Sequence, residues 1–377
     1  MFTLSPNLIE FQNKARAFAQ TRISPRAAAI DQSQEYPRDL HRLLVDQGYM
    51  RTIATPPPEP LRFLKRALLI EEVAYASAAV SMIPMVNELG CTPIQLFGND
   101  AQKQRWLNGV ADGALFASYG LTEPNAGSDV AALTCEARAD GDHFIINGEK
   151  SWICNVQRPG FCVVFATTDP HDKRRSLTAF IVPTDSARFD IINAEPTLGL
   201  CGSPTYNFKL NGVRVAREQI LGQPGDGFRI AMMTLNHTRP AVAAQALGIA
   251  RAARDAALAY ARERKSMGKA LIEHQAIGFM LADMEMKIRA ARHLVYEANV
   301  LLGETPGGDA IVTASAKCFA ADTAMQVSTD AVQIFGGNGY SKNYPVERFF
   351  RDAKVTQIYE GTNQIQRLVI ARKLAQN

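Results

Sequence analysis

The sequence predicts a mainly α-helical protein with one central antiparallel β domain. In the first and last thirds of the 377-residue chain, apolar residues recur at the spacing of a helix face. Between them, short runs rich in β-branched and aromatic residues alternate with turn residues, which is typical of strands. This helix, sheet, helix order differs from the strand–helix alternation of a Rossmann fold. We therefore expect three domains, at residues 1–116, 117–225 and 226–377.

The first domain is predicted to be helical. Leu61, Leu64, Leu68 and Glu71 follow one another at steps of three and four, as residues on one face of a helix do. Three prolines at positions 56–58 precede them. Because proline fixes φ and has no N–H to donate, we expect a stiff connector there.

The second domain is predicted to be a compact antiparallel sheet. Asn147-Gly148 and Asn211-Gly212 each follow a β-rich run, and Asn-Gly is the strongest short hairpin signal. We therefore expect the chain to turn back into a neighbouring strand at both places. The expected strands are 143–146, 161–167, 177–182 and 206–210.

The third domain is again predicted to be helical. A stripe of apolar residues at alternating steps of four and three predicts the core of an antiparallel bundle, so we assign it no chemistry. The next helix is expected over 311–335, ending at Gly336-Gly337, because glycine is a common helix stop. The stripe consists of Ile277, Leu281, Met284, Ile288, Ala291, Val295 and Ala298.

Composition argues against several classes of protein. The net charge is only +4 and no long basic run is present, so nucleic acid is not expected as a partner. The six cysteines form no C-x-x-C pair and the six histidines no H-E-x-x-H pattern, so no metal site is expected. Scattered, reduced cysteines favour a cytoplasmic protein. The N-terminus does not have the pattern of a signal peptide, and no apolar run has the length of a membrane span.

Four polar segments could carry chemistry. Residues 120–129 form a turn-rich stretch whose backbone N–H groups could bind a polar ring system or a phosphate, or which could be a plain connecting loop. Trp152 beside a hairpin could contact a cofactor or simply pack. Residues 238–240 lead into a helix. Arg264, followed by His274-Gln275, could contact a ligand or be a solvated helix end.

The fifth segment contains Glu360, directly before Gly361 and Thr362. A carboxylate against a Gly-Thr turn can act as a base beside a ligand that backbone N–H groups hold. A lone glutamate at a helix end is also a common surface residue. Composition and spacing leave both interpretations open.

Taken together, these segments resemble the acyl-CoA dehydrogenase family, most closely its medium-chain and short-chain branches. The resemblance covers essentially the whole chain, and its motifs occur in the order of the family. These motifs are T-E-P-x-A-G-S-D from Thr122, W-I-x-N from Trp152, D-A-V-Q-I-F-G-G-N-G-Y from Asp330, Y-P-V-E-R from Tyr344, R-D-A-K from Arg351 and Y-E-G-T from Tyr359.

The resemblance implies a C-terminal four-helix bundle, FAD as cofactor and a homotetramer built from two dimers. It implies an oxidoreductase of fatty acid metabolism, a flavoprotein that acts on CH–CH groups. The implied reaction turns acyl-CoA into trans-2-enoyl-CoA by abstraction of the α-proton and transfer of the β-hydride to flavin N5. The implied electron acceptor is an electron-transferring flavoprotein.

The resemblance also assigns site residues. Glu360 matches the catalytic base, and residues 333–337 match a stretch that reaches FAD from the neighbouring subunit. The implied substrate contacts are Ser128, Asn236, Arg239 and Gly361. The implied flavin contacts are Tyr119, Leu121, Thr122, Gly127, Ser128, Trp152, Ile153, Cys154, Arg264, Ser266, Met267, His274, Gln275, Gln333, Gly336, Gly337, Thr362 and Gln364.

One position separates the branches of the family. Some members carry the base just before the arginine that matches Arg239, but this chain has Thr238 there. A threonine hydroxyl cannot serve as that base, so the resemblance assigns the role to Glu360. Arg239 is expected to orient the thioester end and the base, or to be a buried structural arginine.

Three residues depart from the pattern of the family. Cys154 stands where most members have Thr or Ser, and a thiol is a weaker hydrogen-bond donor, so it either changes the flavin or is a tolerated small residue. Asn236 replaces the usual Asp that meets the pantetheine arm, and Cys201 replaces a common Arg. In addition, residues 51–61 replace a loop near the acyl entrance.

These departures cluster where the carrier and the acyl group enter. They leave a second hypothesis, a dehydrogenase of a carrier-protein-bound or unusual acyl thioester in a biosynthetic pathway. A third hypothesis is a flavin-binding protein without catalysis.

Overall fold

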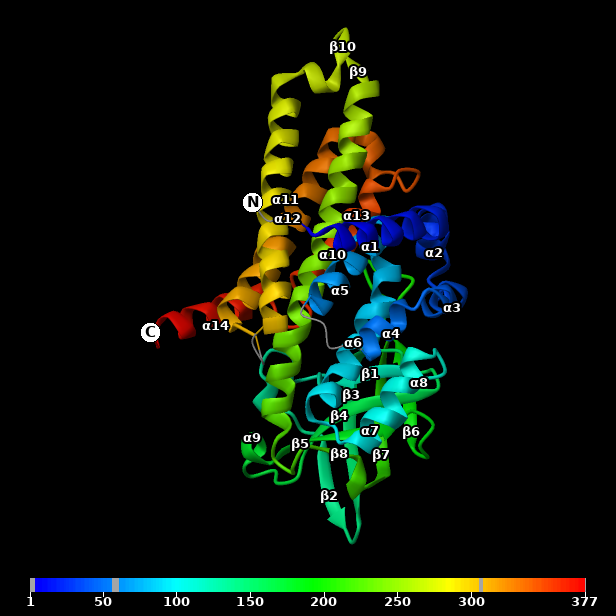
Figure 1. The fold of residues 1–377 in the computed structure, drawn as a ribbon, viewed down its shortest axis with the longest axis vertical. Helices are drawn as coiled ribbons and strands as arrows, with labels where there is room; N and C mark the ends of the chain where they lie inside the picture. The colour runs from blue at the N-terminus through cyan, green and yellow to red at the C-terminus, as the bar shows by residue number, and fades with distance from the viewer. Residues whose placement is uncertain (1–3, 56–60, 305–307, 377) are drawn as a thin grey trace.

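The computed structural model describes residues 4–55, 61–304 and 308–376. Figure 1 shows a β domain at one end of the long axis, long helices at the other end, and the N-terminal helices between and beside them. This order confirms the predicted fold class of two helical domains separated by a β domain.

The N-terminal part is helical, as predicted. Leu64, Leu68 and Glu71 of the expected stripe are fully buried on α5, and Leu61 directly precedes this helix. Buried Glu71 is neutralised by Arg251 of a later helix, whose Nη1 lies 2.7 Å from Glu71 Oε1. The proline connector at 56–58 lies outside the described residues. The helices are α1 (Pro6–Phe18), α2 (Ala27–Ser33), α3 (Arg38–Asp46), α4 (Tyr49–Ala54), α5 (Arg62–Ala76), α6 (Ala78–Phe97), α7 (Asp100–Gln102) and α8 (Asn108–Ala111).

The β domain is one sheet with the strand order β6-β7-β3-β2-β4-β5-β8, in which β1 also pairs with β4. Most ladders are antiparallel, as predicted, but β1 and β2 run parallel to β4. All four expected strands are present. The elements are β1 (Phe116–Gly120), β2 (Glu136–Asp140), β3 (His143–Cys154), β4 (Gly160–Thr167), α9 (Lys173–Ser176), β5 (Leu177–Pro183), β6 (Phe189–Ala194), β7 (Thr205–Ala216) and β8 (Ile220–Leu221).

The two Asn-Gly pairs are not hairpin turns, and that prediction was wrong. Strands β3 and β7 run straight through them, and Asn147 lies opposite Asn211 in the ladder between these strands. The register shifts at this point, because Gly212 adopts φ = +80° and accommodates one extra residue on β7. Gly148 is needed for a different reason, since a Cβ there would lie 2.7 Å from Cys135. The Asn-Gly signal therefore marks a bulge inside two long strands.

The C-terminal part is a helical bundle. The predicted apolar stripe lies on α11, where every member from Leu281 to Ala298 is buried and Ile277 packs against the same core. The predicted stop of α12 is also confirmed, with Gly336 at φ = +59°. The elements are α10 (Gly227–Glu263), β9 (Lys265–Ser266), β10 (Lys269–Ala270), α11 (Gln275–Glu304), α12 (Ala310–Phe335), α13 (Val346–Thr356) and α14 (Asn363–Leu374).

Helix α10 connects the two ends of the molecule, from the β domain to the small β9–β10 ribbon (Figure 1). Residues 238–240 lie inside this helix and do not lead into one, which corrects the prediction. Pro240 is tolerated within α10 and is fully surrounded by the core. Among the described residues, no helix has the length and apolar character needed to cross a membrane.

Candidate active site

Glu360 lies in the turn between α13 and α14. The turn is closed by a backbone hydrogen bond of 2.9 Å from Asn363 N to the Gln357 carbonyl. Glu360 has φ = +52° and Gly361 has φ = +93°, so two consecutive residues are left-handed. This conformation costs about 1–3 kcal/mol for a residue other than glycine and persists only where surrounding contacts enforce it.

The contacts of Glu360 come from α10 and α14. Thr238 Oγ1 donates a hydrogen bond of 2.5 Å to Glu360 Oε2. Arg239 Nε lies 3.4 Å from the Glu360 carbonyl oxygen and Gln366 Nε2 lies 3.3 Å from it. Thr238 stands at the position where some family members carry the base, and here it donates a hydrogen bond to Glu360. Thr238 is a site residue that the sequence reasoning did not assign.

Burial raises the pKa of Glu360 to about 7, because the charged carboxylate loses water around it. The Thr238 hydrogen bond and the positive charges of Arg239 and Lys317 act in the opposite direction, while the nearby Glu88 raises the pKa further. A carboxyl group with a pKa near 7 is suited to accept a proton at neutral pH.

Several buried polar atoms around Glu360 have no hydrogen-bond partner among the described residues. They include the Tyr119 hydroxyl, Thr234 Oγ1 and Gln366 Oε1. Thr234 lies one helical turn before Thr238, and Tyr119 is close enough for the charge of Glu360 to raise its pKa. Because unpaired buried polar atoms are rare in folded proteins, this cluster fits a ligand that supplies hydrogen-bonding groups.

The turn-rich segment 120–129 follows β1, and buried side chains beneath it hold it in place. Glu123 accepts hydrogen bonds from the backbone N–H groups of Thr134 and Cys135 and pairs with buried Lys150 at 2.8 Å. Lys150 Nζ also donates to the Leu121 carbonyl at 3.2 Å. Glu123 is therefore a structural anchor, and Lys150 is a supporting residue that sequence reasoning missed.

The Trp152 segment lies beside this loop, since Ser151 N donates to the Thr122 carbonyl at 3.0 Å. Trp152 is 57% exposed and left-handed, with φ = +65°. Cys154 lies 3.1 Å from Thr205 Oγ1, so its thiol already has a hydroxyl partner. A large exposed aromatic ring next to backbone N–H groups is a suitable surface for a planar polar ring such as a flavin.

The structure separates the predicted flavin contacts into two groups. The first group contains Tyr119, Leu121, Thr122, Gly127, Ser128, Trp152, Ile153, Cys154, Thr362 and Gln364, from the β domain and the start of α14. The second group contains Arg264, Ser266, Met267, His274, Gln275, Gln333, Gly336 and Gly337, around the β9–β10 ribbon and the end of α12.

The second group is assembled around aromatic contacts. Tyr260 stacks on Phe335 with 4.0 Å between ring centroids and accepts a hydrogen bond from Asn338. A ring nitrogen of His274 lies 3.1 Å from the Ser266 carbonyl oxygen. Along α10, the 26 residues from Thr238 to Arg264 correspond to about 39 Å at 1.5 Å per residue. The two groups of one chain therefore cannot contact the same part of one ligand.

Of the remaining predicted substrate contacts, two lie next to Glu360. Gly361 follows Glu360, and Arg239 is buried beside it. Asn236 accepts a hydrogen bond of 2.5 Å from Thr313, so its amide is directed to the start of α12. Ser128 is exposed on the loop after β1.

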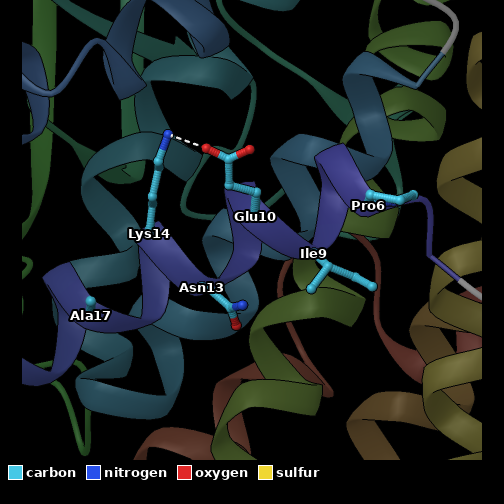
Figure 2. A pocket seen from close by; sticks show the side chains of 6 residues that line it. All are labelled: Pro6, Ile9, Glu10, Asn13, Lys14 and Ala17. Carbon is cyan, nitrogen blue, oxygen red and sulfur yellow. Dashed lines mark ion pairs between the residues drawn. The ribbon is translucent and has the colours of Figure 1, made fainter.

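A shallow surface hollow of about 570 Å³ lies along α1, away from these groups in the sequence. It is lined by Pro6, Ile9, Glu10, Asn13, Lys14 and Ala17, and its Glu10–Lys14 ion pair lies on the surface (Figure 2). None of these residues belongs to the predicted site. In the described ranges, no group of three His, Cys, Asp or Glu side chains is arranged to hold a metal ion.

Three domain models of one protein family match this chain in order. They are the acyl-CoA dehydrogenase N-terminal domain at residues 5–114, the middle domain at 118–213 and the C-terminal domain at 225–375. The chain is 43% identical to the probable acyl-CoA dehydrogenase FadE25 of Mycobacterium tuberculosis, over 99% of this chain and 97% of that protein.

Two solved structures are similar over the full length of both chains. Butyryl-CoA dehydrogenase from Megasphaera elsdenii superimposes with a TM-score of 0.94 and 38% identity. A chain from the structure of the electron transferring flavoprotein of Acidaminococcus fermentans superimposes with a TM-score of 0.95 and 39% identity.

Proposed function

This chain belongs to the acyl-CoA dehydrogenase family, and from that premise we propose that Glu360 removes the α-proton of its acyl-CoA substrate. The chain is an FAD-dependent oxidoreductase that dehydrogenates acyl-CoA. The observation that carries the assignment is the half-buried Glu360, whose carboxyl has a pKa of about 7, on a left-handed turn bonded to Thr238.

The chemistry of the thioester explains what the turn provides. A thioester makes its α-hydrogen acidic, but a placed base is still required, and an acyl chain that excludes water strengthens a carboxylate as a base. The developing enolate oxygen needs hydrogen-bond donors. The backbone N–H of Glu360 donates to no other described residue, so it is available to this oxygen. Arg239 keeps the turn oriented through the Glu360 carbonyl.

The first group of predicted contacts fits the flavin ring of FAD. When bound, FAD accepts the β-hydrogen as hydride and so supplies the redox chemistry. The loop after β1 would hold the polar edge of the ring, and Trp152, Ile153 and Cys154 would cover it. The open space at Gly127 and the exposed ring of Trp152 support this assignment.

The second group is proposed to contact FAD bound mainly by another copy of the chain. Arg264 of this group lies about 39 Å along α10 from Thr238, the hydrogen-bond partner of Glu360. This distance supports the arrangement, because one flavin ring cannot reach both groups of one chain. The exposure of Met267 (93%) also fits a surface that a partner covers. From membership of the family we also propose a homotetramer formed by two such dimers.

The electron acceptor is proposed to be an electron-transferring flavoprotein, because the chain is similar to a structure described with that protein. The six cysteines are all free thiols, which supports a reducing, cytoplasmic environment.

The decisive experiment is anaerobic mixing of purified holoprotein with a panel of straight-chain acyl-CoA and acyl-carrier-protein thioesters. We expect acyl-CoA to bleach the flavin absorbance in the wild type. Glu360→Gln should retain FAD but lose this reduction by at least about 10³-fold, since the variant has no base. Retained single-turnover bleaching by Glu360→Gln would disprove the assignment. If only acyl-carrier-protein thioesters reduced the flavin, the second hypothesis, a dehydrogenase of carrier-bound thioesters in a biosynthetic pathway, would be favoured. Asn236 is the residue that suggests this hypothesis.

A further inference from the structure

A fully buried lysine, Lys317, holds the turn that carries Glu360. It lies in the first half of α12, and its Nζ donates to the Gly361 carbonyl at 2.9 Å and to Asn363 Oδ1 at 3.0 Å. Both acceptors are neutral. Desolvating an ammonium group is unfavourable, and burial lowers the pKa of Lys317 to about 8. A buried cation that faces two neutral oxygen atoms is not accounted for by ion pairing.

From this geometry we infer that Lys317 is a positioning residue for the catalytic base. Gly361 directly follows Glu360 and shares its left-handed backbone. The Gly361 carbonyl is held from two sides, by Lys317 Nζ and by Gln366 Nε2, each at 2.9 Å. Fixing this carbonyl fixes the Gly361–Thr362 peptide, which directly follows the backbone of Glu360, and so restricts the direction of the Glu360 carboxylate. The inference rests on the proposed role of Glu360.

A second residue of α12 holds the ends of the same turn. Asp322 Oδ1 accepts hydrogen bonds from Gln357 Nε2 at 2.6 Å and from Asn363 Nδ2 at 2.7 Å. Asp322 therefore fastens the first and last residues of the turn. Lys317 is the residue of α12 that reaches the carbonyl beside the base, so its loss should free the middle of the turn while the ends remain attached.

The charge of Lys317 also acts on the base. The titratable or charged groups that face Lys317 are Glu360 on the turn, Cys318 and Asp322 on α12, and Arg239 on α10. The lysine cation favours the ionised form of Glu360 and so lowers its pKa, against the effect of burial. Removing this charge should raise the pKa of Glu360. Flavin reduction would then begin to fall at a higher pH on acidification.

Two variants separate the hydrogen bonds of Lys317 from its charge. Lys317→Met has similar length but removes both, whereas Lys317→Gln keeps N–H donors without the charge. With anaerobic stopped-flow mixing of holoenzyme and butyryl-CoA, we expect Lys317→Met to slow the limiting rate of flavin reduction about 10- to 100-fold, as a small misplacement of a catalytic group does. The concentration of butyryl-CoA at half-maximal rate should change less than about threefold. Lys317→Gln should recover part of the rate.

Both variants should share the change in pH dependence, because both lack the charge. The acid limb, which is the part of the pH profile where the rate of flavin reduction falls on acidification, should move to higher pH in each variant. Hydrogen exchange of the backbone amides at residues 357–363 should become faster in Lys317→Met and less so in Lys317→Gln. A merely structural role for Lys317 would change stability or FAD content without moving the acid limb.

The matched control is Lys354→Met. Lys354 is exposed and donates to Gln357 Oε1 at 2.9 Å, so this variant removes a lysine from the solvent side of the same turn. We expect a rate within about twofold of the wild type, since exposed contacts contribute little.

The inference would be overturned if Lys317→Met reduced its flavin at the wild-type rate, or if the acid limb stayed in place in both variants. If Lys317→Met does not fold, Lys317→Gln alone still tests the acid limb. Failure of the proposed function would be seen separately, as flavin reduction by Glu360→Gln.

Discussion

The proposed role of Glu360 as a base requires that its carboxyl has lost a proton, so a pKa of about 7 would set the pH range of the reaction. Burial is the main cause of the raised pKa, and the hydrogen bond from Thr238 opposes it. Acidification through pH 7 protonates Glu360 and should slow flavin reduction. The rate should level off above this range, where the carboxylate is fully ionised.

The Thr238 hydroxyl can be removed with almost no change of shape by Thr238→Val. Because the hydrogen bond of 2.5 Å stabilises the carboxylate, its loss should raise the pKa of Glu360 by about one unit, the size of effect expected when a charge-assisted hydrogen bond of about 1.5 kcal/mol is lost. The acid limb of the flavin reduction rate should therefore shift upward. Single-turnover rates with butyryl-CoA from pH 5.5 to pH 9 measure this. If the acid limb of Thr238→Val stayed at the wild-type pH, Thr238 would not affect the pKa of Glu360.

Among single residues, those inside family motifs could be predicted from the sequence. The residues that hold them in place could not. Glu360 could be predicted because it lies in Y-E-G-T, whereas Lys317 lies in an alanine-rich helix. One signal was available: Lys317 shares its helix face with Thr313, Ala320 and Ala324, all of which are buried. A lysine on an apolar face has to find partners for its ammonium group. Which partners it finds depends on α14, which is distant in the sequence.

At the scale of elements, helix and strand positions were predictable from periodicity, and their ends were less so. The apolar stripe of α11 and the stop of α12 follow from spacing and from Gly336. The Asn-Gly pairs misled the prediction because the same left-handed freedom serves a hairpin turn and a bulge. Only the neighbouring strand decides between the two. Asn147 pairs with Asn211, so both signals belong to one ladder.

Helix α10 packs closely against α5, and Gly248 makes this possible. A Cβ at Gly248 would lie 2.5 Å from the Glu71 carbonyl oxygen and 2.8 Å from Ala74 Cβ. Because the first contact is with backbone, α5 would have to move. We expect Gly248→Ala to reduce the free energy of unfolding by about 1–3 kcal/mol, as overpacked cores do. Thermal unfolding of the holoprotein measures this.

Gly278 on α11 provides the matched control for Gly248. The nearest atom to a Cβ at Gly278 is 3.7 Å away, an ordinary contact distance. Gly278→Ala should therefore leave the melting temperature unchanged or raise it, since alanine favours a helix over glycine by about 1 kcal/mol. Equal melting temperatures for the two variants would contradict the role of Gly248 in helix packing.

At the scale of the whole molecule, the sequence cannot say which copy of a chain a ligand contacts. The motifs around Trp152 and Arg264 belong to one set of predicted flavin contacts, but α10 places Arg264 about 39 Å from Thr238, the hydrogen-bond partner of Glu360. This separation comes from the length of α10, which runs from the β domain to the β9–β10 ribbon (Figure 1). In the proposed arrangement, a complete flavin site would therefore require a second chain.

We expect the other copies of the proposed tetramer to bind where the helical domain exposes apolar side chains. Leu368 (41% exposed) and Leu374 (61% exposed) lie on α14, whose C-terminal end extends away from the bundle (Figure 1), and Phe279 (61% exposed) lies on α11. Apolar surface on a projecting helix is stabilised when a partner covers it. We expect the wild type to sediment as four chains of 41.3 kDa each.

Leu368→Glu should dissociate this assembly, because an uncompensated carboxylate would be buried where two copies meet. Ile9→Glu is the matched control, since Ile9 is similarly exposed (44%) but lies on α1 at the hollow of Figure 2. Sedimentation velocity should show smaller species for Leu368→Glu and the wild-type mass for Ile9→Glu.

Absorbance at the flavin band, recorded in the same runs, reports whether FAD stays with the smaller species. A wild-type monomer that holds one FAD per chain would refute the shared site, because the residues on β9–β10 and at the end of α12 would then have no flavin within reach.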